Sequence, residues 1–125
     1  MDTTLQRFYD GLLAVLRQPT VRDGQWQMLE CRPAWDGNWT WDAFIAFAWQ
    51  GPERRRMLVV ANYAGNQGQC HVRLPFDDLI GRPVRLQDGM SSAVYDRNGD
   101  DLVLPGLYLD MPPWGYHVFN VTGAA

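Results

Sequence analysis

The chain has 125 residues, of which 46% are hydrophobic, and its formal net charge is −3 at pH 7. This length is typical of one domain with its own core, and the composition argues against general disorder. All basic residues are arginines, and their one dense run, residues 54–56, follows a Gly-Pro turn. A basic face is missing, so the charge pattern argues against a nucleic-acid-binding protein.

The N-terminal segment predicts neither secretion nor insertion into a membrane. It contains no basic stretch before an apolar run, so we expect no signal peptide. No apolar run in the chain approaches the roughly 20 residues that a membrane-spanning helix needs. The sequence therefore predicts a cytoplasmic, bacterial protein that does not contact membranes.

Residues 3–17 have the periodicity of an amphipathic helix. Large apolar side chains recur at helical spacing on one face, namely Leu5, Phe8, Tyr9, Leu12, Leu13 and Leu16. Thr3 or Thr4 suits the N-terminal cap, and Pro19 prevents continuation of the helix. We predict an N-terminal helical unit over residues 1–18 that packs on a β domain formed by residues 19–125.

Beyond Pro19 the sequence consists of short runs rich in β-branched and aromatic residues, separated by Gly, Pro, Asn and Asp. The predicted strands are residues 25–31, 41–50, 56–63, 68–74, 83–88, 93–96, 101–104 and 115–121. The dipeptide Asn98-Gly99 predicts a two-residue hairpin turn. Many short strands at this spacing predict a mainly β fold, an antiparallel β-sandwich of Greek-key type.

The stretch GNWTWDAFIAFAWQG, residues 37–51, is the most aromatic part of the chain. The two-residue period of a strand places Trp39, Trp41 and Trp49 on one bulky face, which we predict to be the core face. The opposite face has the small residues Ala46 and Ala48 at its centre, and we expect the N-terminal helix to approach there. The strand that follows is also apolar on both faces, so protein outside this chain is expected to cover the remainder.

Neither the carboxylates nor the histidines form a pattern that predicts catalysis. Asp96, Asn98 and Asp100 alternate as in a calcium loop, but Asp101 stands where that loop requires glycine, so the hairpin is preferred. His71 alternates with core-like neighbours and is predicted to point outward. We predict no catalytic residues and no cofactor.

The two cysteines, Cys31 and Cys70, are far apart in the sequence and lack the spacing of zinc ligands. We predict two reduced thiols in the core and no metal site. A disulfide stays open as an alternative if the strands that carry them are neighbours.

A second group of residues suggests glycan binding. Trp35, Asp36 and Asn38 precede the aromatic strand in a predicted loop, and Trp26 or Trp114 would extend the same platform. An exposed indole offers a flat apolar face to a sugar ring, and Asn and Asp side chains supply hydrogen bonds.

Three segments resemble the end of an alpha-amylase family glycoside hydrolase. LQRFYDGLLAVLRQPTVRDGQWQML is similar to the last barrel helix and the link that follows it. FIAFAWQ and RRMLVVANYAGNQGQCHVRLPF resemble paired strands of the C-terminal domain, and YLDMPPWGYHVFNV resembles its closing strand. The resemblance implies a noncatalytic C-terminal domain whose partner is a catalytic (β/α)8 barrel.

Three functions remain open on the sequence alone. The resemblance implies an accessory domain that stabilises or shields the barrel and contacts glycan at its edge. An autonomous α-glucan-binding module is the alternative, and a small independent enzyme is the third possibility. The exposed apolar surface expected of the accessory domain would also suit a homodimer.

Overall fold

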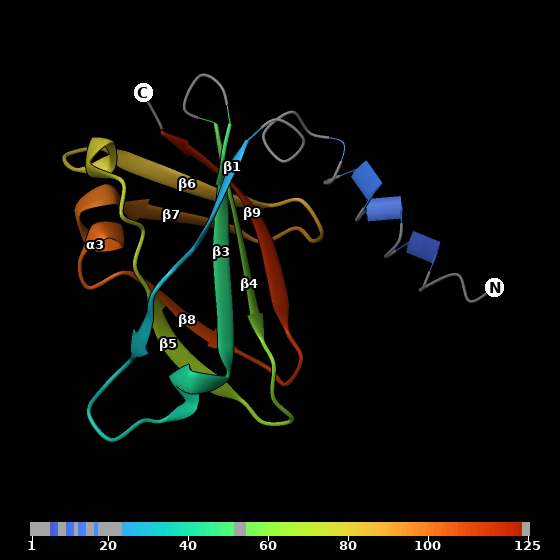
Figure 1. The fold of residues 1–125 in the computed structure, drawn as a ribbon, viewed down its shortest axis with the longest axis vertical. Coiled ribbons are helices and arrows are strands. Elements are labelled where there is room, and N and C mark those ends of the chain that lie inside the picture. Colours follow the sequence, from blue (N-terminus) through green and yellow to red (C-terminus); the bar gives the residue numbers. More distant parts are fainter. Residues whose placement is uncertain are drawn as a thin grey trace.

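The computed structural model describes residues 6, 7, 10, 11, 13, 14, 17, 24–51 and 55–123. The described part is mainly β, and every strand pairing in it is antiparallel. A six-stranded sheet has the order β1-β3-β4-β9-β6-β7, and a three-stranded sheet has the order β2-β5-β8. In Figure 1 the smaller sheet lies across the lower half of the larger one.

The strands are short, as expected from the spacing of turn residues. The six-stranded sheet contains β1 (Gln25–Met28), β3 (Phe44–Gln50), β4 (Arg56–Asn62), β6 (Pro83–Asp88), β7 (Val94–Asn98) and β9 (Tyr116–Gly123). The three-stranded sheet contains β2 (Cys31–Pro33), β5 (Gly68–Val72) and β8 (Leu107–Met111). Short helical turns are η1 (Thr40–Ala43), η3 (Asp77–Leu79) and α3 (Gly99–Val103).

One hydrophobic core lies between the two sheets. Its side chains come from alternate positions of the strands, because successive residues of a strand point to opposite faces. Leu58 of β4 is opposite Phe119 of β9, and both are almost completely buried. Cys70 and Leu109 lie opposite each other on the smaller sheet and join the same cluster. The core therefore unites both sheets.

The predicted hairpin at Asn98-Gly99 is wrong, and so is the predicted strand at residues 101–104. Asn98 ends β7 and caps the short helix α3, since its side-chain oxygen accepts a hydrogen bond from the backbone N–H of Asp100. Gly99 is required here for space, because a Cβ at this position would lie 1.8 Å from the carbonyl oxygen of Leu79. The Asn-Gly pair acts as a helix start, which is the other common use of Asn before a turn.

The predicted faces of the aromatic stretch are also wrong. The strand begins at Phe44, and Ala46 and Ala48 lie on the face that meets the core. Trp39 lies in the preceding loop and is 76% exposed, Trp41 belongs to η1 and packs against the core, and Trp49 points to the opposite face. Alternation determines which residues share a face. It does not determine which face meets the second sheet.

Two strands of the smaller sheet, β2 and β8, were not predicted. The predicted strand 25–31 breaks after Met28, and the chain crosses from the larger sheet to the smaller one before Cys31. Five other predicted strands, at 56–63, 68–74, 83–88, 93–96 and 115–121, are confirmed with small shifts at their ends.

The predicted N-terminal helix lies for the most part outside the described residues and stays a prediction, as do the unit boundaries at residues 18 and 19. Within the described part of the chain, no helix is long and apolar enough to span a membrane.

Candidate functional site

The face of the six-stranded sheet that points away from the core is mostly apolar, and we call it the outer face. Its apolar side chains lie at the positions between the core residues of four neighbouring strands: Trp26, Met28, Ile45, Phe47, Trp49, Met57, Val59, Ala61, Tyr116 and Val118. The polar residues Asn120 and Thr122 lie on the same side at the end of β9. Most soluble antiparallel sheets have polar residues on such a face. An apolar outer face is therefore the feature that the fold itself does not require.

The outer face is buried at one side and open at the other. Met57 and Val118 are buried there, together with the partly buried Val59 and Met90. Gly11 lies against this cluster, because a Cβ on it would be 3.0 Å from the sulfur of Met90. On the β1 side, Trp26 is 54% exposed.

Aromatic rings run from β1 to β3 across this open side. The rings of Trp26 and Phe47 have centroids 6.1 Å apart, and those of Phe47 and Trp49 meet edge to face at 5.2 Å. Such edge-to-face contacts hold the rings in defined positions. The open side is therefore an ordered aromatic surface.

Asn38 is buried because its side-chain amide anchors the loop between β2 and η1. Its side-chain oxygen accepts hydrogen bonds from the backbone N–H of Thr40 at 2.9 Å and from the Thr40 hydroxyl at 2.7 Å. Its side-chain amide donates to Gln69 of β5 at 2.9 Å. Both ends of the Asn38 amide are thus engaged inside the protein, and its role is to position the loop.

Asp36, from the same loop, lies at a shallow hollow of about 300 Å³. Arg32 and His71 line this hollow with it and are opposite each other on β2 and β5. Tyr108 of β8 is the next residue across the sheet, with its ring 5.6 Å from that of His71. Arg32, His71 and Tyr108 therefore form a row across the three-stranded sheet, which we call the outward row. His71 is partly exposed there, which confirms the predicted outward direction of its side chain. Sequence spacing cannot find such a row, because cross-strand register creates it.

The five predicted glycan-binding residues are distributed over different parts of the domain. Trp26 belongs to the outer face, Trp35 and Asp36 to an exposed loop, and Asn38 to the interior of that loop. Trp114 lies in the turn between β8 and β9, where its ring meets that of Tyr63 edge to face at 5.3 Å. No ring contact between described residues joins Trp26, Trp35 and Trp114 to one another.

Trp39 borders another hollow, of about 390 Å³, which sequence analysis missed because it placed this residue in the core. Thr40, Asp42, Ala43 and Asn66 complete its lining. The only sequence signal for it was the position of Trp39 before the apolar alternation of β3 begins.

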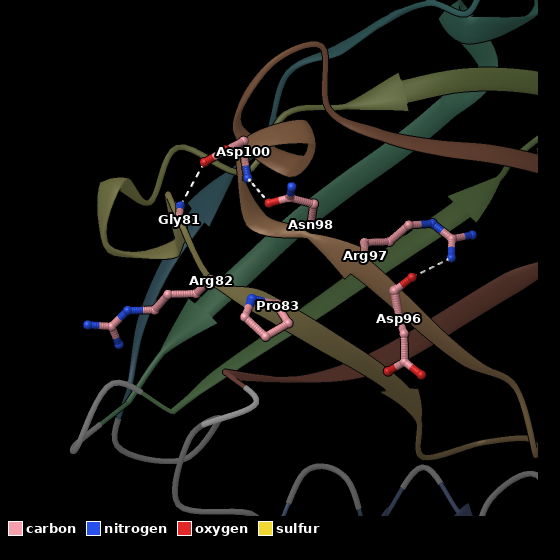
Figure 2. A pocket seen from close by; sticks show the side chains of 7 residues that line it. All are labelled: Gly81, Arg82, Pro83, Asp96, Arg97, Asn98 and Asp100. Carbon is pink, nitrogen blue, oxygen red and sulfur yellow. Dashed lines mark hydrogen bonds between the residues drawn. The ribbon is translucent and has the colours of Figure 1, made fainter.

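A third hollow, of about 470 Å³, lies between the start of β6 and the start of α3. Figure 2 shows that its polar groups are mostly bound to one another. Asp100 accepts a hydrogen bond from the N–H of Gly81 at 2.7 Å, and the Arg97 guanidinium donates to the backbone oxygen of Asp96 at 2.9 Å. Arg82 and Arg97 extend in different directions, so they do not converge on a common ligand (Figure 2).

Among the residues that the structure describes, Asp88 is the most deeply buried carboxylate with a titratable partner. Its carboxylate lies 2.8 Å from Nδ1 of His117 and accepts hydrogen bonds from the N–H of Met90 and the hydroxyl of Ser91. Burial raises the pKa of Asp88, but these hydrogen bonds outweigh it and lower that pKa below its usual range. Ser91 and His117 both bind the carboxylate of Asp88, and among the described hydrogen bonds none joins Ser91 to His117. A catalytic triad requires that bond, so this is a structural cluster.

Cys31 and Cys70 are free thiols on the neighbouring strands β2 and β5. A hydrogen bond between the two thiols, together with burial, raises the pKa of Cys70, and the same bond lowers that of Cys31. The prediction of reduced thiols in the core is consistent with these positions. Among the described residues no group of three or more His, Cys, Asp or Glu side chains could hold a metal ion.

Comparison with known proteins found no matching family model and no matching curated sequence.

Proposed function

We propose that this chain is a noncatalytic accessory β-sandwich, of Greek-key type, that stabilises the catalytic (β/α)8 barrel of an alpha-amylase-like glycosidase by covering part of it. The observation that carries the proposal is the apolar outer face of the six-stranded sheet. Antiparallel sheets that face water usually carry polar residues on the side opposite the core, so an apolar outer face supports contact with a partner.

The energy available from covering this face is considerable. Trp26 alone, at 54% exposure, leaves on the order of 100 Å² in water. At about 25 cal/mol per Å², burying that area contributes roughly 2–3 kcal/mol. Met28 and Ile45 are also large and exposed, and they lie on the same face. Burying all of them therefore strongly stabilises the complex of the domain with a partner. The same partner also keeps the outer face from associating with a second copy.

The resemblance to the end of an alpha-amylase family enzyme names the partner. In that arrangement the segment before the sheet is the last barrel helix, so the barrel stands close to the N-terminal end of the chain. Gly11 against Met90 supports this geometry, because it brings that end of the chain to the buried side of the outer face. The barrel would then cover the open side, near β1.

The experiment begins with the reading frame upstream of Met1, which we expect to encode a barrel. That protein is then produced with and without residues 1–125, and its thermal unfolding is measured. Removal of the domain is expected to lower the unfolding temperature of the barrel. Phe47→Asp in the complete protein should lower it similarly, whereas Ile80→Asp should not, because Ile80 is an exposed apolar residue that follows η3, away from the outer face.

Two results would overturn the proposal. The first is an upstream frame without a barrel. The second is a barrel whose unfolding is unaffected by Phe47→Asp. Sedimentation of the isolated chain distinguishes the alternative occupant: a stable dimer that Phe47→Asp dissociates would assign the outer face to a second copy.

A further inference from the structure

We propose that one end of the domain is a binding site for a neutral oligosaccharide, formed by Trp39, Tyr63 and Trp114 around the hollow that contains Asp42 and Asn66. We call it the aromatic end. It is a different surface from the outer face and does not rest on the proposed function.

The aromatic end is assembled from three connections that are close together in space. The η1 turn, the turn at residues 63–67 and the turn at residues 112–115 all lie at the lower end of the domain in Figure 1. Backbone hydrogen bonds join them: the N–H of Tyr63 donates to the oxygen of Ala43 at 3.0 Å, and the N–H of Trp114 donates to Ala64 at 3.2 Å. Ala43 also lines the hollow beside Trp39. The three aromatic residues therefore border one continuous region.

These aromatic side chains are exposed to an extent that packing does not explain. Trp39 is 76% exposed, Tyr63 69% and Trp114 60%. Each indole left in water forgoes a few kcal/mol of the stabilisation that burial would provide, on the order of 25 cal/mol per Å². A flat, exposed aromatic ring suits a ligand that presents apolar C–H groups on the face of a ring, as a pyranose does.

The exposed pose of Trp39 is held by its neighbours. Asn38 before it and Thr40 after it are both hydrogen-bonded to Gln69 of β5. The N–H of Asp42 donates to the oxygen of Trp39 at 3.3 Å. The loop is thus fixed on both sides of the indole, so the ring is presented outward before any ligand arrives. Such preorganisation lowers the entropic cost of binding.

Trp114 provides an independent observation. Its φ angle is +59°, in the left-handed region that residues with a Cβ rarely adopt. Holding a bulky residue there costs on the order of 1–3 kcal/mol, and such strain is concentrated at binding and catalytic sites. The turn keeps Trp114 in this conformation with its ring against Tyr63, which fixes a second aromatic surface on the connections that are hydrogen-bonded to one another and to Ala43.

The polar groups of the hollow match hydroxyl donors. Asp42 has an exposed carboxylate that accepts no hydrogen bond from a described residue, and Asn66 donates from its amide nitrogen to Gln67, which leaves its side-chain oxygen as an acceptor. The hollow of about 390 Å³ is within the range of small-molecule sites. Aromatic faces with acceptor oxygens and no basic group select a neutral polyhydroxylated ligand over an anion.

The test is a titration of the complete chain, followed by NMR of the tryptophan side-chain N–H groups. The probes are maltoheptaose, an α-linked glucan, and cellohexaose, a β-linked one. Trp39→Ala and Asp42→Ala are each expected to raise the dissociation constant at least about tenfold, and Trp39→Tyr to restore part of the affinity. Tyr108→Ala, an exposed aromatic residue on the outward row of the three-stranded sheet, is the matched control and should bind as the wild type does.

Trp114→Gly separates binding from folding. Glycine adopts the left-handed conformation without strain, so this variant is expected to be as stable to urea as the wild type or more stable, while its affinity for sugar falls. A structural role for Trp114 would instead lower stability.

Each outcome decides the question. Binding of either glucan that depends on Trp39 supports the proposal, and the preferred probe identifies the linkage. The proposal is overturned if neither glucan shifts a tryptophan resonance. It is also overturned if Trp39→Ala binds normally, or if Tyr108→Ala abolishes binding while Trp39→Ala does not, which would move the site to the row of His71.

Discussion

Replacing Asp88 with alanine is the most informative perturbation of the fold. Asp88 ends β6 with a side chain that is 1% exposed. It receives hydrogen bonds from the N–H of Met90 at 2.8 Å and of Val118 at 3.3 Å, from the hydroxyl of Ser91 at 2.9 Å, and it lies 2.8 Å from Nδ1 of His117. One carboxylate therefore joins the β6–β7 connection to the last strand.

The expected loss is large because several donors lose a charged acceptor at once. A hydrogen bond to a charged group contributes about 1.5–3 kcal/mol, but these bonds are not additive, and water can enter beside the exposed Ser91. We therefore expect Asp88→Ala to lower the free energy of unfolding by about 3–5 kcal/mol, measured by urea denaturation at neutral pH. The control is Asp96→Ala, whose carboxylate is exposed and pairs with Arg85 at 2.8 Å, and which should change stability little.

The pH dependence provides a second measurement of the same cluster. Because the pKa of Asp88 is lowered in the folded protein, the unfolded state takes up the proton first as the pH falls. The stabilisation is complete above about pH 5 and is lost progressively below about pH 4. Asp88→Asn should lose less stability over that interval than the wild type does. Parallel losses, or a cost of less than about 1 kcal/mol for Asp88→Ala, would refute the reasoning.

Two further predictions concern the interior. Arg56 is almost buried and forms a bidentate pair with Asp78, with both N–O distances 2.7 Å. Arg56→Ala removes this ion pair from the partly buried Asp78 carboxylate, so we expect it to lower the free energy of unfolding by about 3–5 kcal/mol in urea denaturation. A loss below about 1 kcal/mol would contradict this expectation. Gly99→Ala should destabilise the protein strongly, because the new Cβ would overlap the Leu79 carbonyl. Gly37→Ala should cost only about 1 kcal/mol of strain, because Gly37 has φ +85° but no atom within 4 Å of a Cβ. Equal thermal unfolding temperatures for the two variants would show that the contact at Gly99 can relax.

The candidate surfaces show where sequence reasoning succeeded and where it could not. The two apolar faces of β3 and β4 were evident from alternation, and so was the expectation that one of them needs a cover. Alternation did not show which of the two faces stays uncovered, because the small Ala46 and Ala48 suit close approach by a second sheet as well as by a helix. The sequence predicts that a helix packs on these two alanines, whereas the core between the two sheets does so.

The predicted sugar platform illustrates a different limit. The sequence predicts Trp114 and the loop at residues 35–38 as glycan-binding residues, but the hydrogen bonds of Asn38 to Thr40 and Gln69 make this residue an anchor of the loop. Gln69 is 31 positions away in the sequence, and only strand pairing brings it there. Local patterns identify exposed polar residues, but they cannot tell which of them is already engaged by a distant partner.

By itself the sequence determined that this protein is mainly β, with antiparallel strands at five correctly predicted places, because the two-residue alternation and the turn residues act locally. The tertiary structure alone decided the two-sheet arrangement, the direction of each apolar face, the Asp88 cluster and the hydrogen bonding of the connections that carry Trp39, Tyr63 and Trp114. These features depend on register between strands that are distant in sequence. Such register is set by the packing of the whole core, which no short stretch of residues encodes.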